Sequence, residues 1–291
     1  MGSPGLSTQT IVEELVDANG RSLEDTAAEV GRTLARSRAC LVRNFPTEPD
    51  AYLGFLGHFG EPLPNYSSRS DLDADAPRPQ INRVRYKRKG QYTTHSVHYV
   101  AGELRPHSAR SWRAPRPAYF AMLMVDPGWR DSPEGQRGES VVLRWEHLLT
   151  RLAERDGEVF GEHFARLSGT PLRFQANNVR EELADLPLCY PLPDATSRYD
   201  VGVRLKQDLL DKLPGIADQF PDPETYRRSL EYLVRAAADP AHQVCFPMQA
   251  GDLLLIDNNR FGHGRRTVVG EHGTGDSAAV NPRELWSVTV A

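Results

Sequence analysis

The sequence has 291 residues, of which 39% are hydrophobic and 25% are charged, a composition typical of globular proteins. Its formal net charge of −4 excludes a general attraction to nucleic acid polymers or anionic membranes, so any anion-binding surface has to be local. No apolar run approaches the roughly 20 residues of a membrane span, and the start of the chain lacks the pattern of a secretory signal. The three cysteines are widely spaced and form no CxxC pair, which fits a reducing compartment. We therefore expect a cytoplasmic protein.

The first part of the chain is predicted to be helical. Residues 10–38 have the apolar spacing of two helices, the second of which opens with an acidic first turn. Residues 39–42 indicate a buried strand, and residues 50–59 a further helix that ends at a glycine and a proline. Residues 64–80 are rich in Ser, Asp and Pro and indicate an exposed loop.

Strand-like segments dominate the rest of the chain. A basic, β-prone stretch at residues 81–99 begins the series, and residues 117–125 form a strongly apolar strand candidate. Residues 140–143 continue as a strand into an amphipathic helix over residues 145–155. The later candidates are short strands at 172–177 and 199–205, a helix at 223–238, and two strands at 252–256 and 284–290.

Helices followed by many short strands with long loops predict an antiparallel β-sandwich or jelly roll with helices packed outside. The sequence shows no internal repeat and no interdomain linker. We therefore expect a single domain over residues 1–291, with the helical part of residues 10–60 packed on a jelly-roll core. This length is ample for a core that leaves a cavity for a small-molecule substrate.

The most informative segment is MQAGDLLLIDNNRFGHGRR, residues 248–266. A glycine turn leads into an apolar strand, then a polar corner, and then His263 between two glycines. A histidine just beyond a buried strand has the rigid support and open access that a metal ligand needs. An isolated histidine in a basic loop would more often be a plain surface residue, so the assignment depends on what accompanies it.

The stretch GDLLLIDNNRFGHGR resembles the distal-histidine motif of the taurine dioxygenase and clavaminate synthase superfamily. Other landmarks resemble that superfamily in the same order along the chain. They are residues 39–62, residues 106–125 (PHSARSWRAPRPAYFAMLMV), Gly138-Glu139-Ser140 and residues 282–290 (PRELWSVTV). These proteins are iron(II)/2-oxoglutarate-dependent oxygenases. The resemblance implies a double-stranded β-helix, which is a jelly roll whose mouth holds the iron.

The resemblance also implies which residues form the site. His107 and His263 would meet on adjoining strands and hold Fe(II) on one face, leaving neighbouring positions for 2-oxoglutarate and O2. Arg283 would bind the distal carboxylate of 2-oxoglutarate, because the guanidinium fork matches a carboxylate. Ser140 would supply a hydroxyl to the same carboxylate, where the family usually has threonine.

The sequence departs from the family at the carboxylate ligand. The family's first motif is His-x-Asp or His-x-Glu, whose carboxylate completes a facial triad with two histidines. This chain reads His107-Ser108-Ala109, so a methyl group stands at that position. None of the other eight histidines is followed two residues on by Asp or Glu.

Three explanations for Ala109 remain open. The position can admit chloride as a third ligand, as in iron/2-oxoglutarate halogenases, which carry alanine or glycine there. The protein can be a degenerate relative that binds no iron and acts as a binding module. A carboxylate from elsewhere, such as Glu103 or Asp257, can reach the metal in a hydroxylase of an amino acid or other small metabolite. We favour the halogenase, because a decaying site would also have lost its histidines and Arg283.

Local charge suggests an anionic substrate. The densest basic run contains Arg83, Arg85 and Lys87, shortly before the first metal motif. Such runs are usually solvated strand faces, but they can also capture a phosphate, and a nucleoside monophosphate is the leading candidate. Arg204 is a further candidate substrate contact. Ser287 stands where several amino-acid-modifying relatives resemble one another in having a second arginine, which speaks against an amino-acid carboxylate at that place.

Overall fold

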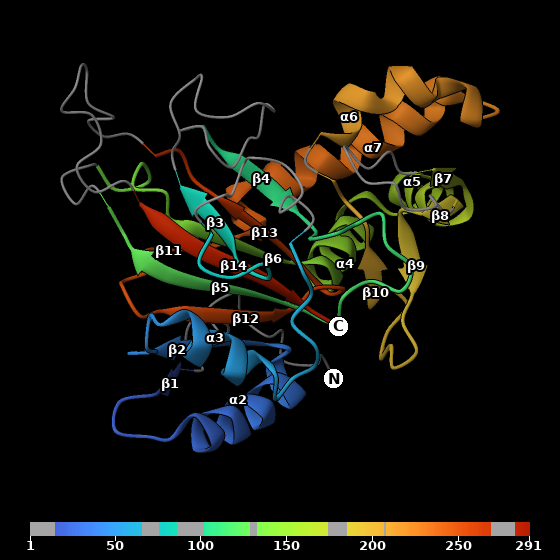
Figure 1. Cartoon of the computed structure of the whole chain (residues 1–291). Coiled ribbons are helices and arrows are strands. Elements are labelled where there is room, and N and C mark those ends of the chain that lie inside the picture. The colour runs from blue at the N-terminus through green and yellow to red at the C-terminus, as the bar shows by residue number, and fades with distance from the viewer. Residues whose placement is uncertain are drawn as a thin grey trace.

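The computed structural model describes seven ranges of the chain. They are residues 15–65, 76–85, 102–128, 133–173, 185–206, 208–268 and 283–291. Within them, two main β-sheets lie face to face, and helices gather in two separate groups (Figure 1). In this part of the chain no helix is both long enough and apolar enough to cross a membrane.

The larger sheet has six strands. Their order is β1 (Leu15–Asp17), β2 (Ala39–Arg43), β12 (Leu253–Asp257), β5 (Tyr119–Asp126), β14 (Glu284–Val290) and β3 (Asn82–Arg85). The β1–β2 pair is parallel and all other pairs are antiparallel. The central strands β12 and β5 are buried along most of their length, as the apolar runs at these positions predicted.

The smaller sheet has four strands, all antiparallel. Their order is β11 (Val244–Phe246), β6 (Ser140–Arg144), β13 (Phe261–Arg265) and β4 (Leu104–His107). Phe261 and Val142 of this sheet pack with Met122 and Leu254 of the larger one in a common core cluster. The jelly roll predicted from the sequence is confirmed by this arrangement. Two short ribbons accompany it, β7 (Pro171–Arg173) with β8 (Asp185–Pro187), and β9 (Cys189–Pro191) with β10 (Val201–Val203).

The helices cover the sandwich in two places (Figure 1). α2 (Leu23–Ser37) and α3 (Pro49–Leu56) pack on the outer face of the larger sheet through a second core cluster. The other group consists of α4 (Trp145–Asp156), α5 (Glu158–Gly169), α6 (Leu209–Lys212) and α7 (Pro223–Ala238), with 3-10 turns at Leu213–Gln219 and Pro240–His242. Side chains of this group form the third core cluster, which includes Leu143 on the outer face of the smaller sheet.

The predicted elements agree with the structure except at a few points. The helix at residues 223–238 and the strand at residues 284–290 have the predicted bounds. Residues 15–17, expected in a helix, form β1 instead, because Val16 turns inward while its neighbours face solvent and the segment pairs with β2. His263 lies inside β13 and not after the strand. Helix α5 was not predicted.

Candidate iron and 2-oxoglutarate site

The smaller sheet brings the two predicted metal ligands together. His107 ends β4 and His263 lies in the middle of β13, and the register places them directly opposite each other. Their ring centroids are 4.4 Å apart, with an angle of 48° between the planes. Both side chains are buried, on the face that looks toward the larger sheet. Two imidazoles so close, on rigid strands, are suited to share one metal ion.

Neighbouring groups hold both imidazoles in place. The Nδ1 atom of His107 lies 2.9 Å from the carbonyl oxygen of Arg105, a contact that orients the ring. Phe120 of β5 stacks on His263, with 4.0 Å between the centroids and 26° between the planes. Burial lowers the pKa of His107, although the Arg105 carbonyl acts in the opposite direction. The neutral imidazole that a metal requires is thereby favoured.

Ala109, which the motif resemblance places where a carboxylate ligand would stand, has both of its backbone groups bound by one side chain. Its N–H donates to Oδ1 of Asn258 at 3.1 Å, and its carbonyl accepts from Nδ2 of the same side chain at 3.1 Å. Its methyl group packs against the core cluster between the sheets. The described residues contain no group of three or more His, Cys, Asp or Glu side chains placed to hold a metal ion. In that part of the chain, no third such side chain joins the two predicted ligands.

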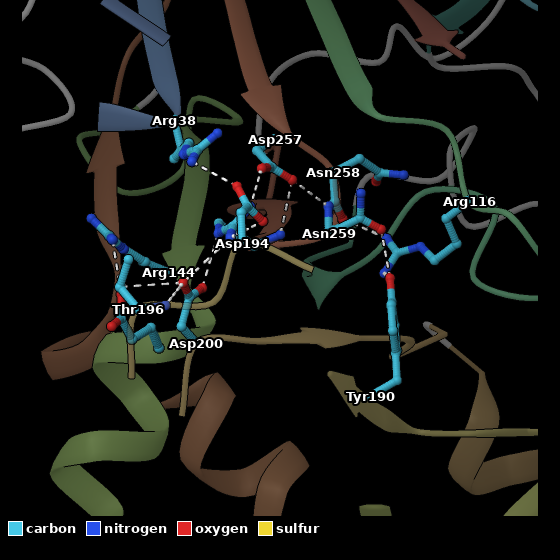
Figure 2. A network of polar contacts seen from close by, with 12 residues as sticks. Arg38, Arg116, Arg144, Tyr190, Asp194, Thr196, Asp200, Asp257, Asn258 and Asn259 are labelled. Atoms are coloured by element: carbon cyan, nitrogen blue, oxygen red, sulfur yellow. Dashed lines mark hydrogen bonds and ion pairs between the residues drawn. The ribbon is translucent and has the colours of Figure 1, made fainter. Parts of the chain in front are cut away.

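The two carboxylates considered as replacements have other partners. Glu103 pairs with Arg266 at 2.8 Å. Asp257 accepts from the N–H of Asn259 at 2.9 Å and pairs with Arg260 at 3.0 Å. Figure 2 shows Asp257 within the corner between β12 and β13. Asp257 therefore orders the polar corner, and neither group is placed as an iron ligand.

Arg283 lies against Gly138, two residues before Ser140 in the chain. Gly138 has a φ of +71°, and a Cβ atom there would lie 3.1 Å from Cδ of Arg283. The stem of Arg283 therefore passes directly over Gly138, two residues before Ser140, and a larger residue would obstruct it. This explains why glycine opens the Gly138-Glu139-Ser140 segment.

The Arg283 guanidinium is a buried charge. Only 5% of the residue is exposed, and among the described residues it makes no hydrogen bond and no ion pair. Burial, and then the nearby charge of Arg265, lower the pKa of Arg283 to about 9, against a smaller opposing effect of Glu139. A buried cation is costly unless an anion meets it. The residues therefore fit the distal carboxylate of 2-oxoglutarate.

Ser140 and Arg265 line the same region. Ser140 is buried, and its hydroxyl donates to the sulfur of Met248 at 3.1 Å. Sulfur is a weak acceptor, so the hydroxyl can turn to a carboxylate at little cost. Arg265 lies opposite Ser140 in the sheet and donates to the carbonyl of Gly102 at 2.7 Å. Sequence reasoning missed Arg265, although its spacing of two from His263 on one strand places both on the same face.

The basic run near β3 is partly neutralised inside the protein. Arg83 forms a two-pronged ion pair with Glu284, with 2.8 Å between Nε and Oε1. Arg85 follows on the same strand, opposite Glu284 in the register, and Lys87 lies outside the described residues. An internal partner for Arg83 weakens the argument that this side chain binds an anionic substrate. Its role, like those of Arg85 and Lys87, stays a prediction.

Arg204 also has partners within the chain. Its Nη1 donates to the carbonyl of Ser111 at 3.1 Å and to that of Arg113, and its guanidinium lies 4.3 Å from the centroid of Tyr190. Burial lowers its pKa to about 10. Through these contacts Arg204 stabilises the loop after Ala109. Its contact with substrate stays a prediction.

Comparison with known proteins identifies the family. The model of the family described as "Taurine catabolism dioxygenase TauD, TfdA family" matches residues 6–289. The chain therefore belongs to the TauD/TfdA family of iron(II)/2-oxoglutarate-dependent oxygenases, and the resemblance inferred from the sequence is confirmed.

Solved structures share the fold at low sequence identity. One is the non-heme iron oxygenase OrfP in complex with Fe and alpha-ketoglutaric acid, 17% identical over 92% of this chain and 82% of that one, with a TM-score of 0.57. Another is an asparagine oxygenase, 15% identical over 92% and 82%, with a TM-score of 0.60. A third is a taurine dioxygenase from Burkholderia xenovorans, 17% identical over 94% and 84%, with a TM-score of 0.56.

Proposed function

We propose that the protein is an Fe(II)/2-oxoglutarate-dependent halogenase that chlorinates an unactivated carbon of a small anionic metabolite. The observation that carries the proposal is Ala109, a fixed alanine at the position of the family's carboxylate ligand. His107, His263 and Arg283 are present with it. A site that lost only its carboxylate is suited to admit a halide at that place.

The proposed roles divide between the metal and its co-substrate. Iron with 2-oxoglutarate and O2 supplies the oxidising power that breaks a C–H bond. His107 and His263 hold the metal, and Arg283 and Ser140 hold the distal carboxylate of 2-oxoglutarate. The small side chain of Ala109 leaves room for chloride.

The overall reaction balances without a further reductant. Substrate, chloride, 2-oxoglutarate, O2 and a proton give the chlorinated product, succinate, carbon dioxide and water. A C–H bond breaks and a C–Cl bond forms at the substrate. O2 is reduced by the electrons released when 2-oxoglutarate is oxidised to succinate and carbon dioxide and when the substrate carbon is oxidised.

Hydroxylation is the second candidate. Two of the similar structures hold hydroxylated amino acids, OrfP with (3S)-hydroxy-L-Arg and asparagine oxygenase with 3-hydroxyasparagine. A hydroxylase would need water or a carboxylate from outside the described residues at the position of Ala109. A non-catalytic binding protein is the third candidate, and it gives no reason to keep a buried cation such as Arg283.

We further propose that the substrate carries a phosphate group. A nucleoside monophosphate is the leading anion, on the support of the basic run that contains Arg83, Arg85 and Lys87, although Arg83 also pairs with Glu284. Oxygen consumption triggered by nucleotides, nucleosides and amino acids would rank the candidates. Equal turnover of nucleosides and their monophosphates, or turnover of amino acids only, would contradict a phosphate anchor.

Anaerobic reconstitution tests halogenation directly. Protein with iron, 2-oxoglutarate, chloride and a metabolite pool is exposed to O2, and products are read by mass spectrometry. We expect chloride-dependent turnover and the chlorine isotope pattern. Ala109→Asp should fill the halide position and suppress chlorination, with some hydroxylation in its place, whereas Ala109→Gly should keep chlorination. Chloride-independent hydroxylation by the unmodified protein would exclude a halogenase and spare the oxygenase.

Metal binding has a separate test. His107→Ala and His263→Ala should each abolish the visible absorption of the iron–2-oxoglutarate chelate, because each removes one of two protein ligands. His147→Ala, on α4, is the matched control and should keep the band. An unchanged band in both ligand variants would favour the binding-protein alternative.

A further inference from the structure

The geometry around Ala109 points to one more residue of the site. We propose that Asn258 is a positioning residue that holds the backbone of Ala109 and thereby sets the space available to chloride. The inference rests on the proposed function, because it concerns the same halide position. Asn258 lies in the corner between β12 and β13 and would itself touch neither iron nor substrate.

The Asn258 carboxamide is fully engaged. It is completely buried, and its Oδ1 accepts from the N–H of Ala109 at 3.1 Å. Its Nδ2 donates to two carbonyls, those of Ala109 and Pro117, each at 3.1 Å. One side chain thus binds both backbone groups of Ala109, as a neighbouring strand would. Rotation of the peptide bonds on either side of Ala109 would break at least one of these bonds.

The rest of the loop after His107 is held from other directions. Ser108 donates through its N–H to the carbonyl of Leu205 at 2.8 Å and through its hydroxyl to that of Val203 at 2.6 Å. Arg110 has a φ of +46°, a conformation that side chains other than glycine seldom adopt. Such a residue persists only when its surroundings determine it. Asn258 supplies the part of that restraint that acts on Ala109 itself.

A network of polar contacts holds the corner that carries Asn258 (Figure 2). The N–H of Asn258 donates to the carbonyl of Ala118 at 2.9 Å, and its own carbonyl accepts from Arg116. Arg260, two residues on, is bound by three aspartates. His263 follows on β13. A single corner therefore positions both the second histidine and, through Asn258, the place beside the first.

This arrangement has a consequence for a halide. An alanine makes room only if its backbone neither moves into the vacated space nor swings away from it. Asn258→Ala removes all three hydrogen bonds of the side chain. Asn258→Asp keeps the shape, but a carboxylate cannot donate to the two carbonyls. Both changes leave buried carbonyls without a donor, which is costly, and the loop should shift.

Chloride binding without substrate gives the first test. Chloride is titrated into the Fe(II)–2-oxoglutarate protein and followed by the visible absorption band. Asn258→Ala and Asn258→Asp should weaken chloride binding about tenfold or more, while 2-oxoglutarate affinity stays within about twofold. Asn259→Ala is the matched control, because its side chain lies in the same corner but accepts from Tyr190. It should leave chloride affinity unchanged.

A second pair of variants separates the two proposals. In Ala109→Asp, the side chain of residue 109 can bind iron. Asn258→Ala should therefore weaken Fe(II) binding about tenfold more in the Ala109→Asp background than in the unmodified protein. If the unmodified protein binds no chloride, the halogenase fails and this pair alone decides the role of Asn258. The inference would be overturned if the Asn258 variants lost no more chloride affinity than Asn259→Ala, or if each variant lost affinity for iron, 2-oxoglutarate and chloride to the same extent. Asn258→Asp, closest in shape, replaces Asn258→Ala wherever thermal melting shows that the latter does not fold.

Discussion

Two arginines with the same exposure have opposite surroundings. Arg260 and Arg283 are each 5% exposed. Three carboxylates bind the guanidinium of Arg260; they belong to Asp194, Asp200 and Asp257, at 2.7, 2.9 and 3.0 Å. Burial alone would lower the pKa of Arg260, but these bonds raise it. The pKa of Arg283 is lowered to about 9 instead.

The difference separates a structural cation from one that we propose to bind an anion. The charge of Arg260 is balanced inside the fold, so this side chain ties the β12–β13 corner to the segment before β10 through Asp194 and Asp200. The charge of Arg283 has no such partner among the described residues. Its desolvation therefore destabilises the fold until a bound anion offsets the cost. Burial by itself therefore does not reveal a functional arginine. The presence or absence of an internal counterion does.

Removing Arg260 should have the largest effect on stability. Arg260→Leu leaves the buried carboxylates of Asp200 and Asp257 without this cation, while Asp194 keeps Arg38. Breaking a buried ion pair costs about 3–5 kcal/mol of the free energy of unfolding. Urea unfolding measures the loss. Arg155→Leu is the control, because the Arg155–Asp156 pair is exposed and such pairs contribute about 1 kcal/mol or less. Similar losses in the two variants would remove the distinction between a buried and an exposed arginine.

Removing Arg283 should affect the ligand and not the fold. Arg283→Leu should weaken 2-oxoglutarate binding by roughly 2–5 kcal/mol, because the distal carboxylate loses its partner. The free energy of unfolding without ligand should stay equal or rise, because a buried charge disappears. Titration and urea unfolding measure the two quantities. Arg283→Lys keeps the charge without the fork and should fall between. A change in affinity under about twofold would mean that another cation binds the carboxylate.

Ligand-induced stabilisation sharpens the same contrast. At a hundred times its dissociation constant, 2-oxoglutarate should raise the free energy of unfolding of the iron-loaded protein by about 2.7 kcal/mol. The same concentration should stabilise Arg283→Leu much less, as read from melting temperatures with and without the ligand. Equal stabilisation of the two proteins would place 2-oxoglutarate away from Arg283.

The sequence predicted those parts of the molecule that depend on local patterns and motif order. Apolar runs located the main strands, such as β2, β5 and β12. The order of the motifs, through the family resemblance, predicted that His107 and His263 meet across 156 residues, and the two pair in the sheet. β1 was missed because its pairing with β2, and not its own pattern, decides its conformation. Helix α5 was missed as well, directly after a glycine that ends α4.

Counterions were the least predictable feature. The sequence alone does not distinguish the arginines at positions 83, 204 and 283. The first two have partners far away in the sequence, such as Glu284 for Arg83. Nothing local to Arg83 reveals that carboxylate, because β3 and β14 become neighbours only in the folded sheet. The same holds for Asn258, whose contact with Ala109 spans 149 residues. Long-range polar pairing requires the register of the sheets, which a sequence pattern does not contain.

The smallest expected effect concerns Ser140, the uncharged half of the carboxylate site. Among the described residues its hydroxyl donates to the sulfur of Met248, a weak acceptor, so Ser140→Ala should change the free energy of unfolding little. Loss of one hydrogen bond to a carboxylate should weaken 2-oxoglutarate binding by about 1.5 kcal/mol, roughly tenfold. Ser140→Thr keeps the hydroxyl and should retain binding. Ser287→Ala is the control, because the Ser287 hydroxyl accepts from Asn82. Unchanged affinity in Ser140→Ala would leave the carboxylate to Arg283 alone, since no hydroxyl would then be needed beside the guanidinium.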